Sequence, residues 1–102
     1  MWCLVMFDLP TQTATQRRAY ATFRNFLLDQ GFVRVQYSIY TKYSPSGVLS
    51  ARAVNLIKRA VPCTGEIRLL HITDRQWADM VCYFNSQQIP DPVEKPEQLL
   101  IF

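Results

Sequence analysis

The first ten residues, MWCLVMFDLP, constrain the fold more than any other stretch of this chain. Seven apolar residues run from Met1 to Phe7, which is typical of a central strand covered on both faces of a sheet. Asp8 follows where the strand leaves the sheet, and Pro10 ends the pairing because proline has no amide hydrogen to donate. A carboxylate in this position is either a turn residue or part of a functional site.

Length and composition indicate one folded domain. The chain has 102 residues, enough for a single modest core, and 49% of them are hydrophobic. No segment approaches the roughly 18 consecutive apolar residues of a membrane span, and the N-terminus does not resemble a secretory signal. Three cysteines without a C-x-x-C pair favour neither a disulfide framework nor a zinc site. We therefore expect a cytoplasmic protein in which Cys3, Cys63 and Cys82 are small core residues.

The charge is distributed unevenly along the chain. Residues 1–60 hold eight basic and two acidic residues, a net charge of +6, whereas residues 61–102 hold three basic and six acidic residues, a net charge of −3. The basic half is rich in arginine, whose planar guanidinium suits phosphate better than lysine does. This pattern indicates either a polyanionic partner or an ordinary solvated surface.

Apolar residues at helical spacing predict two main helices. The first covers TQTATQRRAYATFRNFLLDQG, with Thr11 or Thr13 as its cap and Gly31 at its end. The residues expected on its buried face are Tyr20, Phe23, Phe26 and Leu27. The second covers VLSARAVNLIKRAV, where Arg52, Asn55 and Arg59 lie on a different face from the apolar residues. A short third helix is predicted at TDRQWADM, since Thr73 and Gln76 have the spacing of a capping box.

Three more strands are predicted, at FVRVQYSIYTKY, TGEIRLLHIT and VCYF. With both main helices on one face of an antiparallel sheet, this order predicts an α+β fold, a ferredoxin-like βαββαβ sandwich. We expect the domain to cover residues 1–85 and a polar, proline-bearing linker to begin at residue 86. The linker leads to QLLIF, an apolar strand that would add to a sheet edge, either its own or, as we favour, that of a second copy.

Few residues have the pattern of catalytic chemistry. His71 lies among apolar residues in a predicted strand, which favours a structural role, and Glu66 has the pattern of an ordinary surface carboxylate. Asp8 alone binds Mg²⁺ poorly, because the ion requires octahedral oxygen ligation. A two-fold axis that brings two Asp8 carboxylates together would create a shared site with a substrate phosphate. The alternative is that Asp8 caps the first helix or fixes the turn at Pro10.

Three segments carry a family resemblance: VMFDLPTQT, RRAYATFRNFLLDQGFVRVQYSIY and GEIRLLHITDRQW. They combine a strand followed by Asp-x-Pro, a basic pair at the start of the next helix, and QYSIY in the second strand. Together they resemble the CRISPR-associated Cas-two family, in particular the variant of type II CRISPR systems, over about residues 2–85.

The resemblance implies a prokaryotic, ferredoxin-like homodimer that binds the Cas-one integrase. That assembly captures short duplex DNA and inserts it as new spacers, with the homodimer as its scaffold. The family is also described as Mg²⁺-dependent endonucleases that act on single-stranded RNA or double-stranded DNA, so Asp8 is implied as the catalytic and metal-binding residue. Phe7 stands where many members have tyrosine. The resemblance implies nucleic-acid binding for Arg17, Arg18 and Arg34.

Three hypotheses follow. The first is a DNA-binding scaffold for spacer acquisition, and the second is a free Mg²⁺-dependent endonuclease acting on RNA or DNA. The third, an RNA-binding module of the same broad fold, is weaker because GEIRLLHI lacks the aromatic residues on which such modules stack bases. The first two differ in their dependence on Asp8, since cleavage needs the carboxylate and scaffolding does not.

Overall fold

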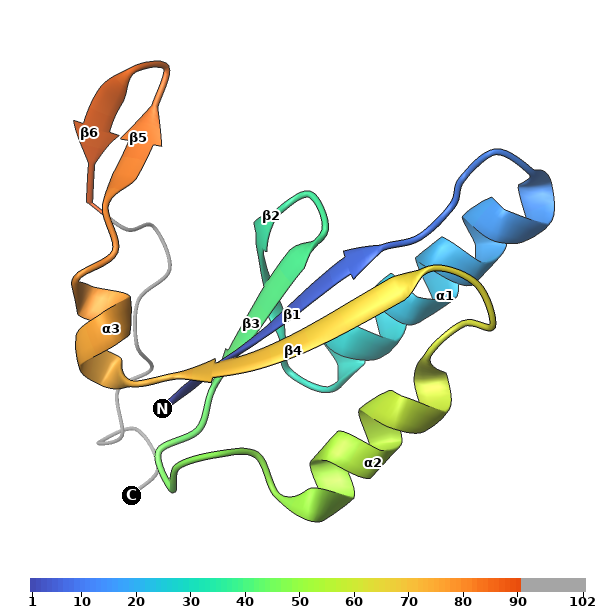
Figure 1. The fold of residues 1–102 in the computed structure, drawn as a ribbon, viewed down its shortest axis with the longest axis horizontal. Coiled ribbons are helices and arrows are strands. Elements are labelled where there is room, and N and C mark those ends of the chain that lie inside the picture. The colour runs from blue at the N-terminus through green and yellow to red at the C-terminus, as the bar shows by residue number, and fades with distance from the viewer. Residues whose placement is uncertain (91–102) are drawn as a thin grey trace.

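The computed structural model describes residues 1–90, which form six strands and three helices within that range (Figure 1). The elements are β1 (Trp2–Asp8), α1 (Ala14–Asp29), β2 (Val33–Gln36), β3 (Ile39–Tyr43), α2 (Ala51–Ala60), β4 (Glu66–Ile72), α3 (Asp74–Ala78), β5 (Cys82–Phe84) and β6 (Gln87–Ile89). Elements β1 to β4 with α1 and α2 follow the βαββαβ order of the predicted ferredoxin-like fold. Its second and third strands both come from a segment predicted as one strand. Within residues 1–90, none of the helices combines the length and apolar character that a membrane crossing requires.

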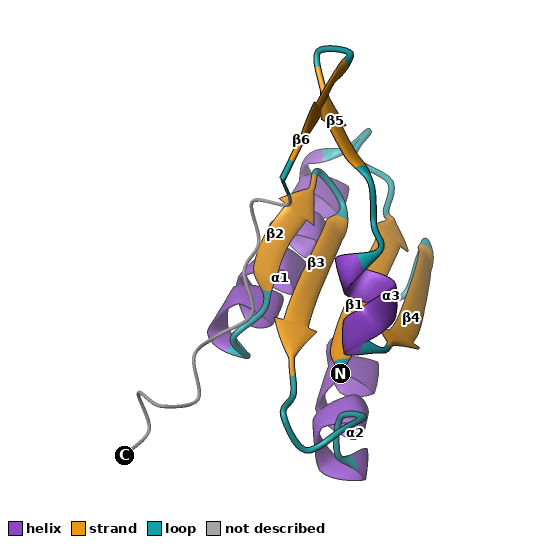
Figure 2. Cartoon of the chain, turned by 90° about the vertical axis from the view of Figure 1, so that its left-hand side faces the viewer, coloured by secondary structure: helices purple, strands orange, loops and turns teal. Residues whose placement is uncertain are grey.

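The main sheet has four strands in the order β2-β3-β1-β4, and each neighbouring pair is antiparallel. β1 is therefore central, as its apolar sequence predicts. Helices α1 and α2 lie on the same face of this sheet, and α3 lies on the other (Figures 1 and 2). This arrangement confirms the predicted α+β fold of ferredoxin-like topology.

The core lies between the sheet and its two main helices. Every second residue of β1, namely Cys3, Val5 and Phe7, is buried toward α1 and α2. Helix α1 contributes the predicted residues Tyr20, Phe23 and Leu27 to the same cluster, and α2 contributes Ile57. The expectation that β1 is covered on both faces along its length is wrong, because Leu4 and Met6 are only half-buried on the opposite face.

Local sequence signals place the helix ends. Thr13 caps α1 through a capping box with Gln16, so Thr13 rather than Thr11 is the cap. Gly31 follows the end of α1 at φ +90°, the left-handed conformation predicted for it. Thr73 and Gln76 form the second predicted capping box, at the start of α3.

The predicted single strand over FVRVQYSIYTKY is instead a hairpin of β2 and β3, with Tyr37 and Ser38 between the strands. The reason is tertiary: the Tyr20 hydroxyl on α1 donates to the carbonyl of Tyr37 at 3.1 Å and shares a 3.0 Å hydrogen bond with Ser38 Oγ. Tyr40 is buried and Val33 is exposed, and the register of the β2–β3 pair shifts between Arg34 and Gln36.

The predicted strand at VCYF forms, but outside the main sheet. β5 pairs with β6 in a separate hairpin, whose turn residues Asn85 and Ser86 both have positive φ, as a two-residue turn of type I′ requires. Residues 87–89 are therefore a strand where we expected a linker from residue 86. The predicted C-terminal strand QLLIF, which belongs to residues 86–102, lies outside the described residues.

The cysteines do not share one environment. Cys3 is buried in the core as predicted, whereas Cys63 is exposed and Cys82 is half-buried. All three are free thiols. The expectation that all three are core residues is therefore wrong for Cys63, which lies in the loop between α2 and β4.

Candidate functional site at the end of the central strand

Asp8 is the last residue of β1 and is exposed. Because side chains alternate along a strand, Asp8 shares a face with Met6 and Leu4, opposite to α1 and α2. Its carboxylate forms no hydrogen bond or ion pair with any residue in the range 1–90. Thr13 caps α1, so Asp8 does not serve as that cap. The carboxylate is thus available to a ligand on the uncovered side of the sheet.

A close backbone contact fixes the position of this strand end. Gly65, at φ +97°, precedes β4, and a Cβ atom placed there would lie 2.8 Å from the Asp8 carbonyl oxygen and 2.6 Å from Leu9 Cδ2. Only glycine allows both this conformation and this approach. The loop into β4 therefore packs directly on the backbone that carries the Asp8 carboxylate.

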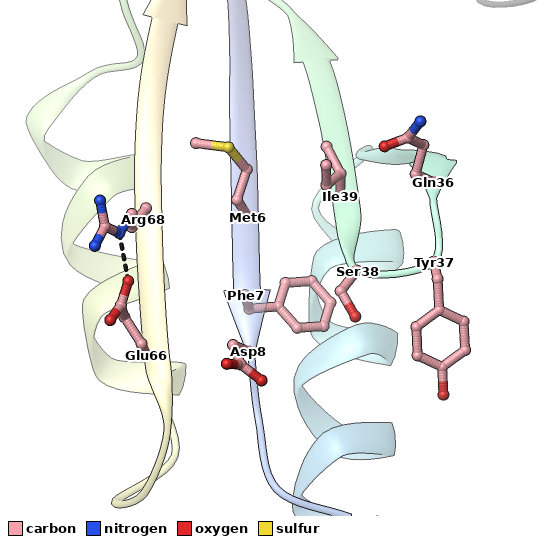
Figure 3. Close-up of a pocket in the computed structure, with 9 residues that line it drawn as sticks. All are labelled: Met6, Phe7, Asp8, Gln36, Tyr37, Ser38, Ile39, Glu66 and Arg68. Carbon is pink, nitrogen blue, oxygen red and sulfur yellow. Dashed lines mark hydrogen bonds and ion pairs between the residues drawn. The ribbon is translucent and has the colours of Figure 1, made fainter. Parts of the chain in front are cut away.

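A hollow of about 410 Å³ opens beside Asp8 on the uncovered face (Figure 3). Met6 and Ile39, on adjacent strands, contribute its apolar lining. The other residues that line it are Phe7, Asp8, Gln36, Tyr37, Ser38, Glu66 and Arg68. The β2–β3 turn lies on one side of Asp8 and β4 lies on the other (Figure 3). The β2–β3 hairpin, which was predicted as a single strand, therefore forms the side of the site opposite β4.

Glu66 and Arg68 place a second carboxylate and a cation beside Asp8. Glu66 is the direct register partner of Asp8 across the β1–β4 ladder. The Arg68 guanidinium donates a hydrogen bond to Glu66, and this bond raises the pKa of Arg68. The sequence alone did not predict that Glu66 and Arg68 belong to the site beside Asp8. The alternation Glu-x-Arg in β4 puts them on one face, but the register that sets Glu66 opposite Asp8 is a tertiary property.

The predicted nucleic-acid-binding residues are not among those that line this hollow. Arg17 and Arg18 are exposed in the first turns of α1, and Arg34 is exposed on β2. Arg17 donates to backbone carbonyls before the helix, and the Arg34 guanidinium lies 5.7 Å from the centroid of the Tyr37 ring. None of the three arginines lines the hollow beside Asp8.

The donor set in one chain is too small for an all-protein metal site. Within the described range, no group of three or more His, Cys, Asp or Glu residues is placed to hold an ion. Mg²⁺ usually keeps several waters and takes one or two carboxylates together with substrate phosphates. An exposed Asp8 from each of two chains would supply two carboxylates of such a set, and Asp8 of one chain supplies one.

His71 has the structural role predicted for it. Its Nε2 atom accepts a hydrogen bond of 3.1 Å from the backbone amide of Leu49, just before α2. Leu49 is itself buried, so the bond ties the chain entering α2 to β4.

Fold and site together define a class: a small ferredoxin-like protein with a free carboxylate at the tip of its central strand and exposed arginines at the start of the following helix. The sequence matches the family described as CRISPR associated protein Cas2 over residues 1–80. The chain belongs to the Cas2 family.

Curated relatives agree with this assignment. A protein of Parvibaculum lavamentivorans is 40% identical over 102 residues, which cover the whole of both chains. A protein of Streptococcus mutans is 39% identical over 88 residues, covering 86% of this chain and 80% of the relative. One of Flavobacterium psychrophilum is 36% identical over 100 residues, covering 98% and 85%. Each of these relatives is named CRISPR-associated endoribonuclease Cas2.

Proposed function

We propose that this chain acts as a homodimeric scaffold that binds short duplex DNA for spacer acquisition, together with the Cas-one integrase in a prokaryotic cytoplasm. The observation that carries the proposal is that Arg17, Arg18 and Arg34 are exposed but do not line the Asp8 hollow, whereas Arg68 does. Cations that served only a cleavage site would surround its carboxylate. Arg17, Arg18 and Arg34 instead occupy surfaces on α1 and β2.

These arginines suit the phosphate backbone. Guanidinium groups bind phosphate oxygens through paired, charge-assisted hydrogen bonds. Contacts of this kind fix the position of a duplex without reading its sequence, as a scaffold for spacers of any sequence requires. RNA offers the same phosphate chemistry and is a further ligand to test.

The uncovered sheet face supports self-association. Leu70 is 49% exposed and Val33 is 48% exposed on this face, beside the half-buried Met6 and Ile39. Apolar sheet faces are normally covered by another layer. A second copy packed here would cover them, and the C-terminal strand is proposed to add to the partner's sheet edge.

A dimer of this kind also allows a shared Mg²⁺ site. One Asp8 from each chain would hold the ion, and Arg68 would face the same ligand from the neighbouring strand. When bound, Mg²⁺ supplies Lewis acidity toward a phosphoryl oxygen and toward water. The chain's own contribution is to keep the Asp8 carboxylate unpaired and to hold its backbone against Gly65.

The second candidate function is a Mg²⁺-dependent endoribonuclease or endodeoxyribonuclease that acts alone. The observation in its favour is the guanidinium of Arg68 beside Asp8, which would compensate charge on a phosphate in the hollow. The relatives' name, endoribonuclease, points to the same activity on RNA.

The two functions differ in their need for Asp8. We would compare wild type with Asp8→Asn on single-stranded RNA and on duplex DNA, with Mg²⁺ and with chelator. A spacer-integration assay with the cognate integrase would run beside it. Asp29→Asn is the matched control, because Asp29 is also an exposed carboxylate but ends α1.

If the protein acts as a scaffold, we expect spacer integration to persist with Asp8→Asn and with the Asp29→Asn control, as it does with wild type. Loss of integration on replacing Arg17 and Arg18 by glutamine would agree with it. If Asp8→Asn abolishes both cleavage and integration while Asp29→Asn abolishes neither, the scaffold proposal is wrong and the nuclease is the working activity.

A further inference from the structure

Helix α2 carries a second basic surface that the proposed function leaves unused. Its ten residues include three cations and no acidic residue. Arg52, Asn55 and Arg59 line a surface hollow of about 430 Å³, with Leu56 as its apolar member. We call Arg52, Asn55 and Arg59 the α2 row. Sequence spacing had placed these three side chains on one face, and the structure confirms that they share one hollow.

The arginines of the α2 row have no partner in the fold. Neither guanidinium forms a hydrogen bond or ion pair with any residue in the range 1–90. Arg68, in contrast, is bonded to Glu66, and Arg17 to backbone carbonyls. Two unpaired guanidinium groups around one hollow leave their donors available to an anionic ligand.

Helix stability does not explain Arg52. Basic residues in the last turn interact favourably with the helix dipole, which accounts for Lys58 and Arg59. Arg52 lies in the first turn, directly after Ala51, where the dipole disfavours a cation and where no acidic residue compensates it. A local rule broken without structural gain is typical of a functional position.

The spacing of the α2 row suits a duplex. Arg52 and Arg59 are seven residues apart, which is about 10 Å along a helix axis. Successive phosphates of one strand of duplex DNA rise about 3.4 Å along its axis, so the row spans about three phosphates. Helix α2 has no aromatic side chain on which unpaired bases could stack, a contact on which single-strand binders rely.

We propose that the α2 row is a second phosphate-binding site for duplex DNA, separate from Arg17, Arg18 and Arg34. This proposal rests on the proposed function, because both take short duplex DNA as the ligand. Because Glu66 at the start of β4 pairs with Asp8, the end of α2 and the start of α1 lie at the same end of the sheet. Both helices also lie on one face (Figure 1), so one duplex can contact both.

The test measures the dissociation constant of a fluorescent mixed-sequence duplex over a series of salt concentrations. The variant is Arg52→Gln with Arg59→Gln. The control is Lys58→Gln with Arg75→Gln, which removes the same charge from exposed positions outside the row. We expect the slope of log affinity against log salt to fall by about two in the row variant, with roughly tenfold weaker binding. The control should change the affinity less than about twofold, and lysine at both row positions should keep most of the slope.

Three other outcomes would each contradict one of these claims. If wild type binds the duplex and the row variant has an unchanged slope, the α2 site is wrong while the proposed function stands. If the row variant weakens a labelled single strand as much as the duplex, the assignment to duplex DNA is wrong. If wild type binds no duplex, the proposed function fails together with this site. Circular dichroism of each variant verifies that its helix content matches that of wild type.

Discussion

The two faces of the main sheet are built from the same strands but differ in what covers them: α1 and α2 cover one face and leave the other largely uncovered (Figures 1 and 2). On the helix-covered face, Cys3, Val5 and Phe7 are between 0% and 6% exposed. On the other face, their strand neighbours Leu4 and Met6 are half-buried, and Leu70 on β4 is 49% exposed. The sequence of β1 is apolar from Trp2 to Phe7, so the difference in burial comes from what each face packs against. An apolar face without its own helix layer is available to a partner.

The uncovered face is itself divided into two ends. At one end the chain closes it with α3: Trp77 stacks on Trp2 with ring centroids 4.1 Å apart, and Trp2 is 2% exposed. At the other end lie Asp8 and its hollow, without such a cover in the described part of the chain. The molecule thus uses its own aromatic residues to close the end that lacks the carboxylate.

Truncating one side chain on each face gives the largest expected contrast. Phe23→Ala on the covered face should lower the free energy of unfolding by about 3–5 kcal/mol, because Phe23 is 1% exposed and packs edge-to-face on Phe7. Leu70→Ser on the uncovered face should change it by less than about 0.5 kcal/mol in dilute protein. Urea denaturation at low concentration measures both.

Analytical ultracentrifugation at higher protein concentration then measures self-association, separately from the packing within one chain. We expect Leu70→Ser to weaken self-association, since Leu70 would be buried between two copies. A large loss of stability in dilute Leu70→Ser would show that the chain covers this face by itself. Unchanged association in that variant would contradict the proposed dimer.

A smaller contrast compares two glycines with positive φ. Gly65→Ala should cost about 2–4 kcal/mol, because the new Cβ adds a clash with the Asp8 carbonyl to the strained conformation. Gly47→Ala has φ +110° but nothing within 4 Å, so it should cost only about 1 kcal/mol. Thermal unfolding of both variants isolates the clash. Equal losses would mean that the loop does not fix the Asp8 strand end.

Local signals in the sequence were sufficient for the helices and the core. The Thr13 and Thr73 capping boxes act within four residues, and Tyr20, Phe23 and Leu27 follow helical spacing. The position of Asp8 was also predictable, because an apolar run that ends on Asp-x-Pro is a local pattern. These features need no knowledge of the rest of the chain.

The features that could not be predicted from the sequence depend on contacts between residues that are far apart in the chain. The β2–β3 turn has no glycine or proline, and its stability comes from the Tyr20 hydroxyl on α1. The pairing of β5 with β6 relies on positive φ at Asn85 and Ser86, a weak sequence signal at serine. Glu66 entered the candidate site only through its register with Asp8. Tertiary pairing, rather than local propensity, decided each of these.

The covered face also predicts a pH dependence of the free energy of unfolding. Burial raises the pKa of the Cys3 thiol to about 11 from 9.0, although the nearby charge of Lys42 opposes the shift. The folded state therefore binds this proton more tightly than the unfolded state. The resulting stabilisation is complete below pH 9.0 and is lost as the pH rises through about 11. A shift of this size corresponds to about 2–3 kcal/mol.

The measurement compares the free energy of unfolding of wild type and Cys3→Ala from pH 8 to pH 11. Wild type should lose about 2–3 kcal/mol more than the variant over that interval, since the variant has no thiol to ionise in the core. The comparison with Cys3→Ala removes the effects of pH that do not involve this thiol. Cys63→Ala, which removes an exposed thiol, should follow wild type. Parallel curves for wild type and Cys3→Ala would mean that water reaches Cys3, and that the covered face is as open as the face that carries Asp8.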